Sequence, residues 1–181
     1  MNKKEQIVQT AISLFATNGY DATSIQKLAE ASGVAQGLLY RHFKNKEDLL
    51  LHLVDIGMQQ IAATLAPYAD PSLSFAQAMQ QHVTLSCQYI QAHTQLWRVL
   101  HGTRQYLASL QTPVEMPDIR EAVIKPIKKK LQQGGHKDAE TTAWILLSLI
   151  DGLTAMYLLH PEVYPLEKVK KTLIEKAESY A

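Results

Sequence analysis

An all-α fold of about nine helices is what this sequence predicts. Apolar residues recur three and four positions apart along most of its 181 residues, which is the spacing of helices with a buried face. No segment alternates apolar and polar residues between hairpin turns, so strands are not expected. With 46% hydrophobic residues, the chain can bury a core and is expected to be globular.

The first predicted helix runs from about Asn2 to Asn18, and Gly19 can adopt the positive φ that ends a helix. Lys3 and Lys4 lie near its beginning, although cations there oppose the helix dipole. Either a solvated terminus or a nearby phosphate backbone would account for these two lysines.

A helix-turn-helix is predicted at about residues 24–43. Thr23 is the expected N-cap of its first helix, and Gln26 completes a capping box. Gly33 supplies the sharp turn, and the second helix begins at Ala35. An ordinary helical hairpin has the same pattern, and the alternative is a DNA-binding motif whose second helix enters a major groove.

A long helix is expected from about Lys46 to Ala66, with Asn45 as its cap. The same periodicity predicts further helices over about 72–92, 94–110, 118–133, 138–160 and from 165 onward. Thr94 is the expected cap of the 94–110 helix, and Pro126 is expected to kink the 118–133 helix.

Many of the first 55 residues stand at the spacing of one family of DNA-binding proteins. In order, they are Ile7, Ala11, Leu14, Phe15, Gly19, Tyr20, Thr23, Ser24, Ile25, Leu28, Ala29, Gly33, Val34, Gly37, Leu39, Tyr40, Arg41, His42, Phe43, Lys46, Glu47, Leu49 and Leu50. Over about residues 3–55 the chain closely resembles the N-terminal domain of the TetR family of transcriptional regulators. The resemblance implies a helix-turn-helix domain over residues 1–50 and a helical ligand-binding and dimerisation domain over residues 51–181.

The expected contacts with DNA come from both helices of the motif. Thr23 and Ser24 are expected to offer hydroxyl and N–H groups to a phosphate, because a helix N-terminus attracts anions. The resemblance implies that Ala35, Gln36, Gly37 and Arg41 face base edges, where Gln can pair with adenine and Arg with guanine. It also implies that Tyr40, His42, Lys44 and Lys46 hold phosphates. Residues 1–46 carry six Lys or Arg against three Asp or Glu, and this modest excess fits phosphate contact.

The segment from about Asp138 to His160 is apolar nearly all round, which predicts that more than one of its faces is buried. It is not expected to span a membrane, because its apolar run is short of the ~20 residues needed and Asp151 lies at its centre. The final helix, from about Pro165, has one apolar face. In TetR-like proteins the last two helices pair across a two-fold axis, so the resemblance implies a homodimer through these two segments.

A mixed stripe of His93, Trp97, His101 and Arg104 follows one side of a predicted helix. Trp97, His101 and Arg104 are candidate ligand-binding residues, together with Asp151, which needs a partner in its apolar setting. A half-exposed helix edge has the same composition and is the competing interpretation.

Several classes of function are excluded by what the sequence lacks. The single cysteine, Cys87, permits no intrachain disulfide and indicates a reducing compartment. The polar first residues lack a signal core, so a cytoplasmic protein without a membrane anchor is expected. No metal-ligand, nucleophile or phosphate-loop motif is present, so no enzyme activity, metal or cofactor is expected. The lysines at 125 and 128–130 are interpreted as cations near a helix C-terminus, in preference to a second DNA site.

The residues and the resemblance together predict a dimeric regulator that binds double-stranded DNA. A repressor is favoured over an activator, and an unidentified small-molecule effector is expected to release it from a pseudo-palindromic operator. One alternative is a small-molecule-binding helical protein or enzyme in which the N-terminal helices only pack. A second is a helical dimer with a scaffolding role.

Overall fold

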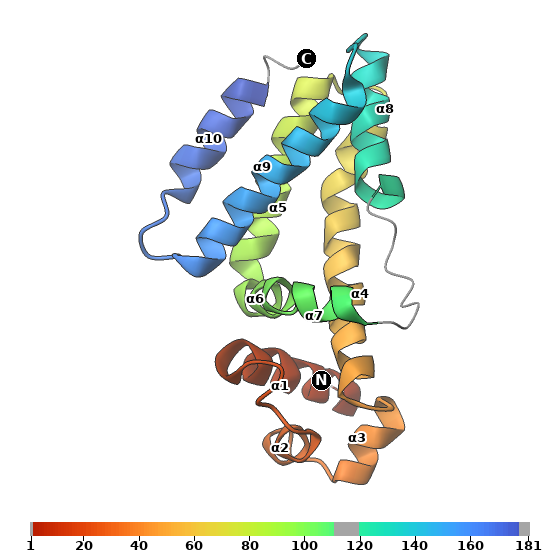
Figure 1. Cartoon of the computed structure of the whole chain (residues 1–181), viewed down its shortest axis with the longest axis vertical. Helices are drawn as coiled ribbons and strands as arrows, with labels where there is room; N and C mark the ends of the chain where they lie inside the picture. The colour runs from red at the N-terminus through yellow and green to blue at the C-terminus, as the bar shows by residue number, and fades with distance from the viewer. Residues whose placement is uncertain (1, 111–119, 178–181) are drawn as a thin grey trace. The chain divides into compact units, whose positions relative to one another are not determined.

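The computed structural model describes residues 2–110 and 120–177, and over these residues it contains helices but no strand. Its elements are α1 (Lys3–Asn18), α2 (Ile25–Ala31), α3 (Gln36–His42), α4 (Lys46–Leu65), the 3₁₀ turn η1 (Ala66–Ala69), α5 (Phe75–Ala92), α6 (Thr94–Gly102), α7 (Arg104–Ser109), the π-helical turn η2 (Arg120–Ile124), α8 (Lys125–Gln133), α9 (Ala139–Leu159) and α10 (Leu166–Ala177) (Figure 1). The predicted all-α fold is confirmed.

The helices form two compact units, Met1–Gln59 with His93–Gln111 and Gln60–Ala92 with Thr112–Ala181. This division differs from the expected one at residue 50, because α6 and α7 belong to the first unit. Leu96 and Val99 of α6 are buried in the same apolar core as the residues of α1. The first unit therefore contains the helix-turn-helix, most of α4, and α6 and α7.

The core of the first unit is built from one face of each helix. Its fully buried side chains are Ile7, Leu28, Leu39, Leu49, Leu50 and Leu53. Gly57 of α4 is also buried, and a methyl group at its Cα would overlap Cδ1 of Leu100 in α6. The absence of a side chain at Gly57 thus lets α4 and α6 approach closely.

Helix ends in the first unit follow local chemistry. Asn2 and Glu5 form a reciprocal capping box at the start of α1, and Gly19 ends this helix with φ of 85°. Asn45 caps α4 as predicted, since its Oδ1 accepts from the Asp48 N–H at 2.7 Å.

Three predicted helix boundaries were wrong. The side chain that caps α2 belongs to Ser24, which accepts from the Lys27 N–H at 3.2 Å, while Thr23 is buried. Thr94 is the first residue of α6 and does not cap it. The predicted 94–110 helix is divided at Thr103, whose hydroxyl donates to the Val99 carbonyl at 2.8 Å. Such back-bonding competes with a regular helix.

The second unit packs α5 against α9 and α10, and α8 against α9. Its fully buried apolar side chains include Met79, Val83, Ile127, Leu131 and Leu146. The predicted free thiol Cys87 lies in this core, where burial raises its pKa to about 11.

One polar cluster is buried in this unit. Tyr68 Oη lies 3.0 Å from His82 Nδ1 and donates to Met79 Sδ at 3.1 Å. Burial lowers the pKa of His82 from 6.5 to about 4, so the imidazole is neutral near pH 7. The hydroxyl of Tyr68 therefore faces an uncharged ring, and which of the two groups donates depends on the His82 tautomer.

Two of the α8 lysines have partners other than the carbonyls at the end of this helix. Lys130 is buried and donates to the Asp70 carbonyl at 2.6 Å, while Lys128 pairs with Glu140 at 2.6 Å. Pro126 is the second residue of α8 and directly follows the π-helical turn η2, where the regular hydrogen-bond pattern of the helix changes. The predicted start of this helix at residue 118 lies outside the described residues.

We expected the apolar segment near the C-terminus to be too short to cross a membrane. This expectation was wrong about length, because α9 has 21 residues. By length and apolar composition alone, both α9 and the segment Lys46–Ala69 are long enough to cross a bilayer, as core helices of soluble proteins also are. Five large apolar side chains of α9 and the turn after it are exposed, namely Ile145, Leu149, Met156, Leu159 and Val163. In the described chain, α9 thus combines a buried face with an uncovered apolar face.

Candidate nucleic-acid interface

The turn between α2 and α3 is held rigidly from several sides. Gly33 has φ of 60°, in the left-handed region that favours glycine, and the Val34 N–H donates to the Ala29 carbonyl at 3.0 Å. From α1, Gln6 Nε2 donates to the Ser32 carbonyl at 2.8 Å. The α2–α3 pair is therefore fixed to α1 by a hydrogen bond that no periodicity in the sequence indicates.

The second helix of the motif, α3, separates an inner from an outer face. Leu39 is fully buried and Leu38 is half-buried. The exposed residues at or near this helix are Ala35, Gln36, Gly37, Tyr40, Arg41, His42 and Lys44. Tyr40 is 48% exposed, so its hydroxyl and part of its ring face solvent. The outer face offers amide, phenol and guanidinium groups beside a glycine that permits close approach.

Thr23 and Ser24 do not contribute equally to the predicted phosphate site. The Thr23 side chain is fully buried, and its hydroxyl donates to the Gly19 carbonyl at 2.8 Å. Its predicted hydroxyl contact with DNA is therefore unsupported, because this hydroxyl already has a partner in the interior. Ser24 is exposed and caps α2.

Lys44 and Lys46 also differ. The Lys44 backbone N–H donates to the Asp48 carboxylate at 2.9 Å, and its side chain is exposed. The Lys46 ammonium instead donates to the Tyr20 carbonyl at 2.9 Å and lies 4.2 Å from the centre of the Tyr20 ring. Only Lys44 thus has the free, exposed side chain expected of a phosphate-binding lysine.

A further cation lies at the end of α3. The ammonium of Lys4 lies 5.6 Å from the centre of the Phe43 ring, and this ring lies 5.5 Å from that of His52. Partial burial and the nearby Lys4 charge lower the pKa of His52, so its ring is the neutral neighbour of this cation. The contact accounts for a lysine at the start of α1 without requiring DNA.

Three of the four predicted ligand-binding residues lie close together in the first unit. His101 Nε2 lies 3.3 Å from Arg104 Nη2, and the rings of Trp97 and His101 are 6.2 Å apart. These three residues therefore form one patch on α6 and α7. Asp151 lies in α9, within the other compact unit.

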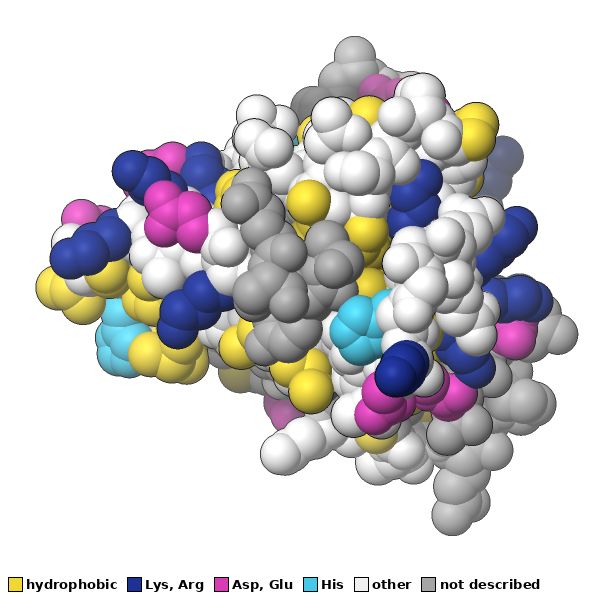
Figure 2. Space-filling model, turned by 90° about the horizontal axis from the view of Figure 1, so that it is seen from above, with side chains coloured by type: hydrophobic (Ala, Val, Ile, Leu, Met, Phe, Trp, Pro, Cys, Tyr) yellow, Lys and Arg dark blue, Asp and Glu magenta, His cyan; other side chains and the backbone are white. Residues whose placement is uncertain are grey.

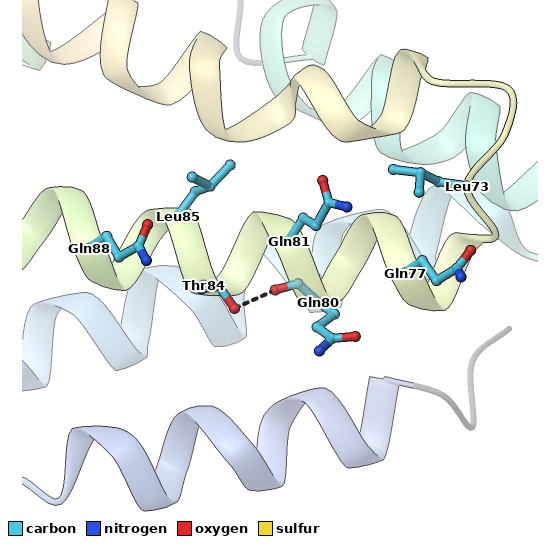
Figure 3. Close-up of a pocket in the computed structure, with 7 residues that line it drawn as sticks. All are labelled: Leu73, Gln77, Gln80, Gln81, Thr84, Leu85 and Gln88. Atoms are coloured by element: carbon cyan, nitrogen blue, oxygen red, sulfur yellow. Dashed lines mark hydrogen bonds between the residues drawn. The ribbon is translucent and has the colours of Figure 1, made fainter.

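A separate groove of about 550 Å³ follows α5 (Figure 3). It is lined by Leu73, Gln77, Gln80, Gln81, Thr84, Leu85 and Gln88, none of which is ionisable. Gln77 Oε1 accepts from the Ser74 N–H at 2.8 Å, and the Thr84 hydroxyl donates to the Gln80 carbonyl at 2.7 Å. Two of its polar groups are therefore engaged within the chain, and the groove has no charge to attract an ion.

Charge on the described surface is mixed. Figure 2 shows Lys and Arg side chains scattered over one face, several of them beside Asp or Glu. On α8, for example, Lys125 pairs with Glu121 at 2.6 Å. Among the residues that the structure describes, no three His, Cys, Asp or Glu side chains are grouped as a metal site requires. Among the described residues, no metal site therefore competes with the outer face of α3 as the candidate functional surface.

Comparisons with known proteins agree with this geometry. The family model described as bacterial regulatory proteins, tetR family, matches residues 7–53. The fatty acid metabolism regulator protein of Bacillus subtilis is 43% identical over 58 residues, 32% of this chain and 30% of that protein. The regulator AcrR of Shigella flexneri is 24% identical over 178 residues, 91% of this chain and 82% of that protein.

The first relatives are matched over a small part of their own length. The alignment covers 20% of the regulator YerO of Bacillus subtilis and 30% of the fatty acid metabolism regulator of the same organism.

Solved structures extend the agreement in fold to the whole chain. FadR from Bacillus subtilis, determined in complex with stearoyl-CoA, superposes with a TM-score of 0.81 at 22% identity and covers 98% of each chain. A tetR-family protein from Rhodococcus RHA1 gives a TM-score of 0.80 at 22% identity, over 99% of this chain and 97% of that one. Residues 7–53 therefore form a domain of the tetR family, and the fold of the whole chain is that of these solved regulators.

Proposed function

We propose that this protein is a ligand-responsive transcriptional repressor that binds double-stranded DNA through α3. The observation that carries the proposal is the asymmetry of this helix, with Leu39 fully buried while Gln36, Gly37 and Arg41 are exposed. A helix held on its inner face and polar on its outer face can enter a major groove without unfolding.

The exposed groups divide into base and phosphate contacts. Gln36 can form a bidentate pair with adenine and Arg41 with guanine, while Ala35 and Gly37 leave room for the bases. We assign the flanking phosphates to Tyr40, His42, Lys44 and Ser24, and the exposure of these four residues supports the assignment. Thr23 supports these contacts from the interior, because its hydroxyl donates to the Gly19 carbonyl and holds the segment before α2.

The proposed active form is a homodimer through α9 and α10. Ile145, Leu149, Met156 and Leu159 repeat at about heptad spacing along α9 and are 43% exposed or more, which leaves an apolar surface that water solvates poorly. A two-fold pair would present two α3 helices to successive major grooves about 34 Å apart, on a pseudo-palindromic operator.

The proposed signal is a small molecule. Support comes from a relative named for fatty acid metabolism and from a FadR structure in complex with stearoyl-CoA. Trp97, His101, Arg104 and Asp151 remain the candidate effector-binding residues. Any effector that lowers affinity for DNA must bind more weakly when DNA is bound, because coupling between two sites is reciprocal.

The same proposal places the protein in the cytoplasm, with the DNA, and assigns it no catalytic activity. Its matched relatives are named as regulators, and no metal or cofactor is needed for the proposed reading of DNA.

Selection from a random duplex library tests this function directly. The purified protein should enrich one pseudo-palindromic sequence and bind it at least about 10³-fold more tightly than random DNA at roughly 150 mM salt. The Gln36→Ala, Tyr40→Ala double variant should lose this preference while retaining the wild-type melting temperature. Binding that is equal for all sequences would refute the proposal and favour a small-molecule-binding protein whose N-terminal helices only pack.

An effector screen completes the test. Candidate small molecules, beginning with long-chain acyl-CoA esters, should release the selected duplex in a concentration-dependent manner. An enzyme would instead convert the added compound, which mass spectrometry of the recovered compound would reveal.

A further inference from the structure

Lys46 stands where the family resemblance implies a phosphate contact, yet its ammonium points into the protein. It donates to the Tyr20 carbonyl at 2.9 Å and lies 3.4 Å from the Asp21 carbonyl. The same ammonium lies 4.2 Å from the centre of the Tyr20 ring, within the range of a cation–π contact. Lys46 is the first residue of α4, so these contacts join α4 to the segment between α1 and α2.

Tyr20 is packed on two further sides. Its ring meets Phe15 of α1 edge-on, with centroids 5.2 Å apart, and it is 9% exposed. The ring of Tyr106, from α7, lies 4.9 Å away. Burial and a hydrogen bond with Tyr106 both raise the pKa of Tyr20, so its hydroxyl stays protonated at ordinary pH.

All four residues lie in the first compact unit, and each comes from a different part of it. Phe15 belongs to α1, Tyr20 to the α1–α2 segment, Lys46 to α4 and Tyr106 to α7. Residues from four parts of the first unit therefore pack around Tyr20, just before the helix-turn-helix.

We propose that Tyr20, Lys46 and Tyr106 form a joint that fixes the helix-turn-helix against α4 and α7, and that Lys46 is a positioning residue, not a phosphate contact. The proposal rests on the DNA-binding function proposed above. It assigns α7 a role in DNA affinity although no residue of α7 belongs to the DNA-facing surface. A lysine is suited to this task because its three N–H donors can hold two carbonyls while its charge faces a ring.

Salt dependence of DNA binding separates positioning from phosphate contact. Each phosphate contact that is lost should reduce the slope of log K against log[salt] by about 0.9. Lys46→Met keeps the apolar stem and removes the charge. It should weaken binding to the duplex selected by the wild-type protein by about tenfold, the factor expected for a lost charged hydrogen bond, and leave the slope unchanged. The matched control, Lys44→Met, removes an exposed lysine two residues away and should lower the slope.

Tyr106→Phe provides the second arm. Loss of one hydroxyl should reduce affinity for the same duplex by about fivefold, again with an unchanged slope. Thermal unfolding of Lys46→Met, Tyr106→Phe and the double variant tests the joint without DNA. Each single variant should lower Tm by roughly 2–4 °C, and the double variant should lose clearly less than the two shifts combined.

The outcomes separate failure of the joint from failure of the proposed function. If the wild-type protein selects no DNA sequence, the DNA-binding function fails, while additive or coupled Tm shifts still decide whether the joint exists. If it selects a duplex but Lys46→Met lowers the salt slope by about 0.9, Lys46 is a phosphate contact and the proposal is overturned. Additive Tm shifts together with an unchanged affinity of Tyr106→Phe would overturn it as well.

Discussion

Acidification should destabilise the second unit through His82. This side chain is 4% exposed, its Nδ1 lies 3.0 Å from Tyr68 Oη, and burial lowers its pKa from 6.5 to about 4. The unfolded chain therefore takes up a proton near pH 6.5, whereas the folded chain resists protonation until about pH 4. Because the unfolded state binds more protons in this window, stability falls as pH falls through it.

The size of the effect follows from the two pKa values. A difference of about 2.5 pKa units corresponds to about 3 kcal/mol of unfolding free energy, lost between pH 6.5 and pH 4. About 2 kcal/mol of it should be lost by pH 5, a large share of the ~5–15 kcal/mol that stabilises a typical domain.

Urea unfolding of His82→Asn at about pH 7.5 and about pH 5 isolates this contribution. The Asn amide can accept from or donate to the Tyr68 hydroxyl but does not titrate. The variant should be less stable at the higher pH through lost packing, yet its further loss at the lower pH should be about 2 kcal/mol smaller than that of the wild type. His42→Asn, at an exposed histidine, is the control and should keep the wild-type pH dependence. Equal losses in wild type and His82→Asn would refute the assignment of acid sensitivity to His82.

Three further changes probe the motif and the dimer. Gly33→Ala should lower stability by about 1–2 kcal/mol, because φ is 60° there, whereas Gly37→Ala should raise it by up to about 1 kcal/mol, because the site is helical and open; thermal melts that rank the two variants in the opposite order would contradict this. Gln36→Ala should cost about 1–3 kcal/mol in binding the selected duplex and leave binding to random DNA unchanged, as fluorescence anisotropy can measure. Leu149→Glu should convert the proposed dimer to a monomer in sedimentation velocity at micromolar concentration, since it places a charge on the exposed apolar face of α9; a variant that remains dimeric would show that the interface lies elsewhere.

Helix ends and turns that are determined by residues close together in the sequence could be predicted. Gly19 ends α1 and Asn45 caps α4, because each acts on backbone groups within four residues. Ser24 and Thr23 are both favourable caps by residue type, and the burial of Thr23 leaves Ser24 as the cap. The helix-turn-helix itself was predictable because its turn, caps and apolar spacing all lie within one short segment.

Long-range contacts were not predictable from spacing. The partner of Lys46 lies 26 residues earlier in the chain, and that of Lys130 lies 60 residues earlier. Both lysines look like surface charges in the sequence, and each is instead directed inward by a backbone carbonyl. For the same reason α6 and α7 were placed in the second domain, although the buried Leu96 and Val99 belong to the core of the first unit.

The close approach of α4 and α6 at Gly57 restricts the substitutions that evolution can make at this position. Because a methyl group at Gly57 would overlap Cδ1 of Leu100, the two positions are not free to change independently. A gain of volume at 57 requires the end of the Leu100 side chain to move, so Leu100→Val should reduce the cost of Gly57→Ala when the two are combined. Among close relatives, a larger residue at 57 is therefore expected beside a smaller or differently oriented residue at 100.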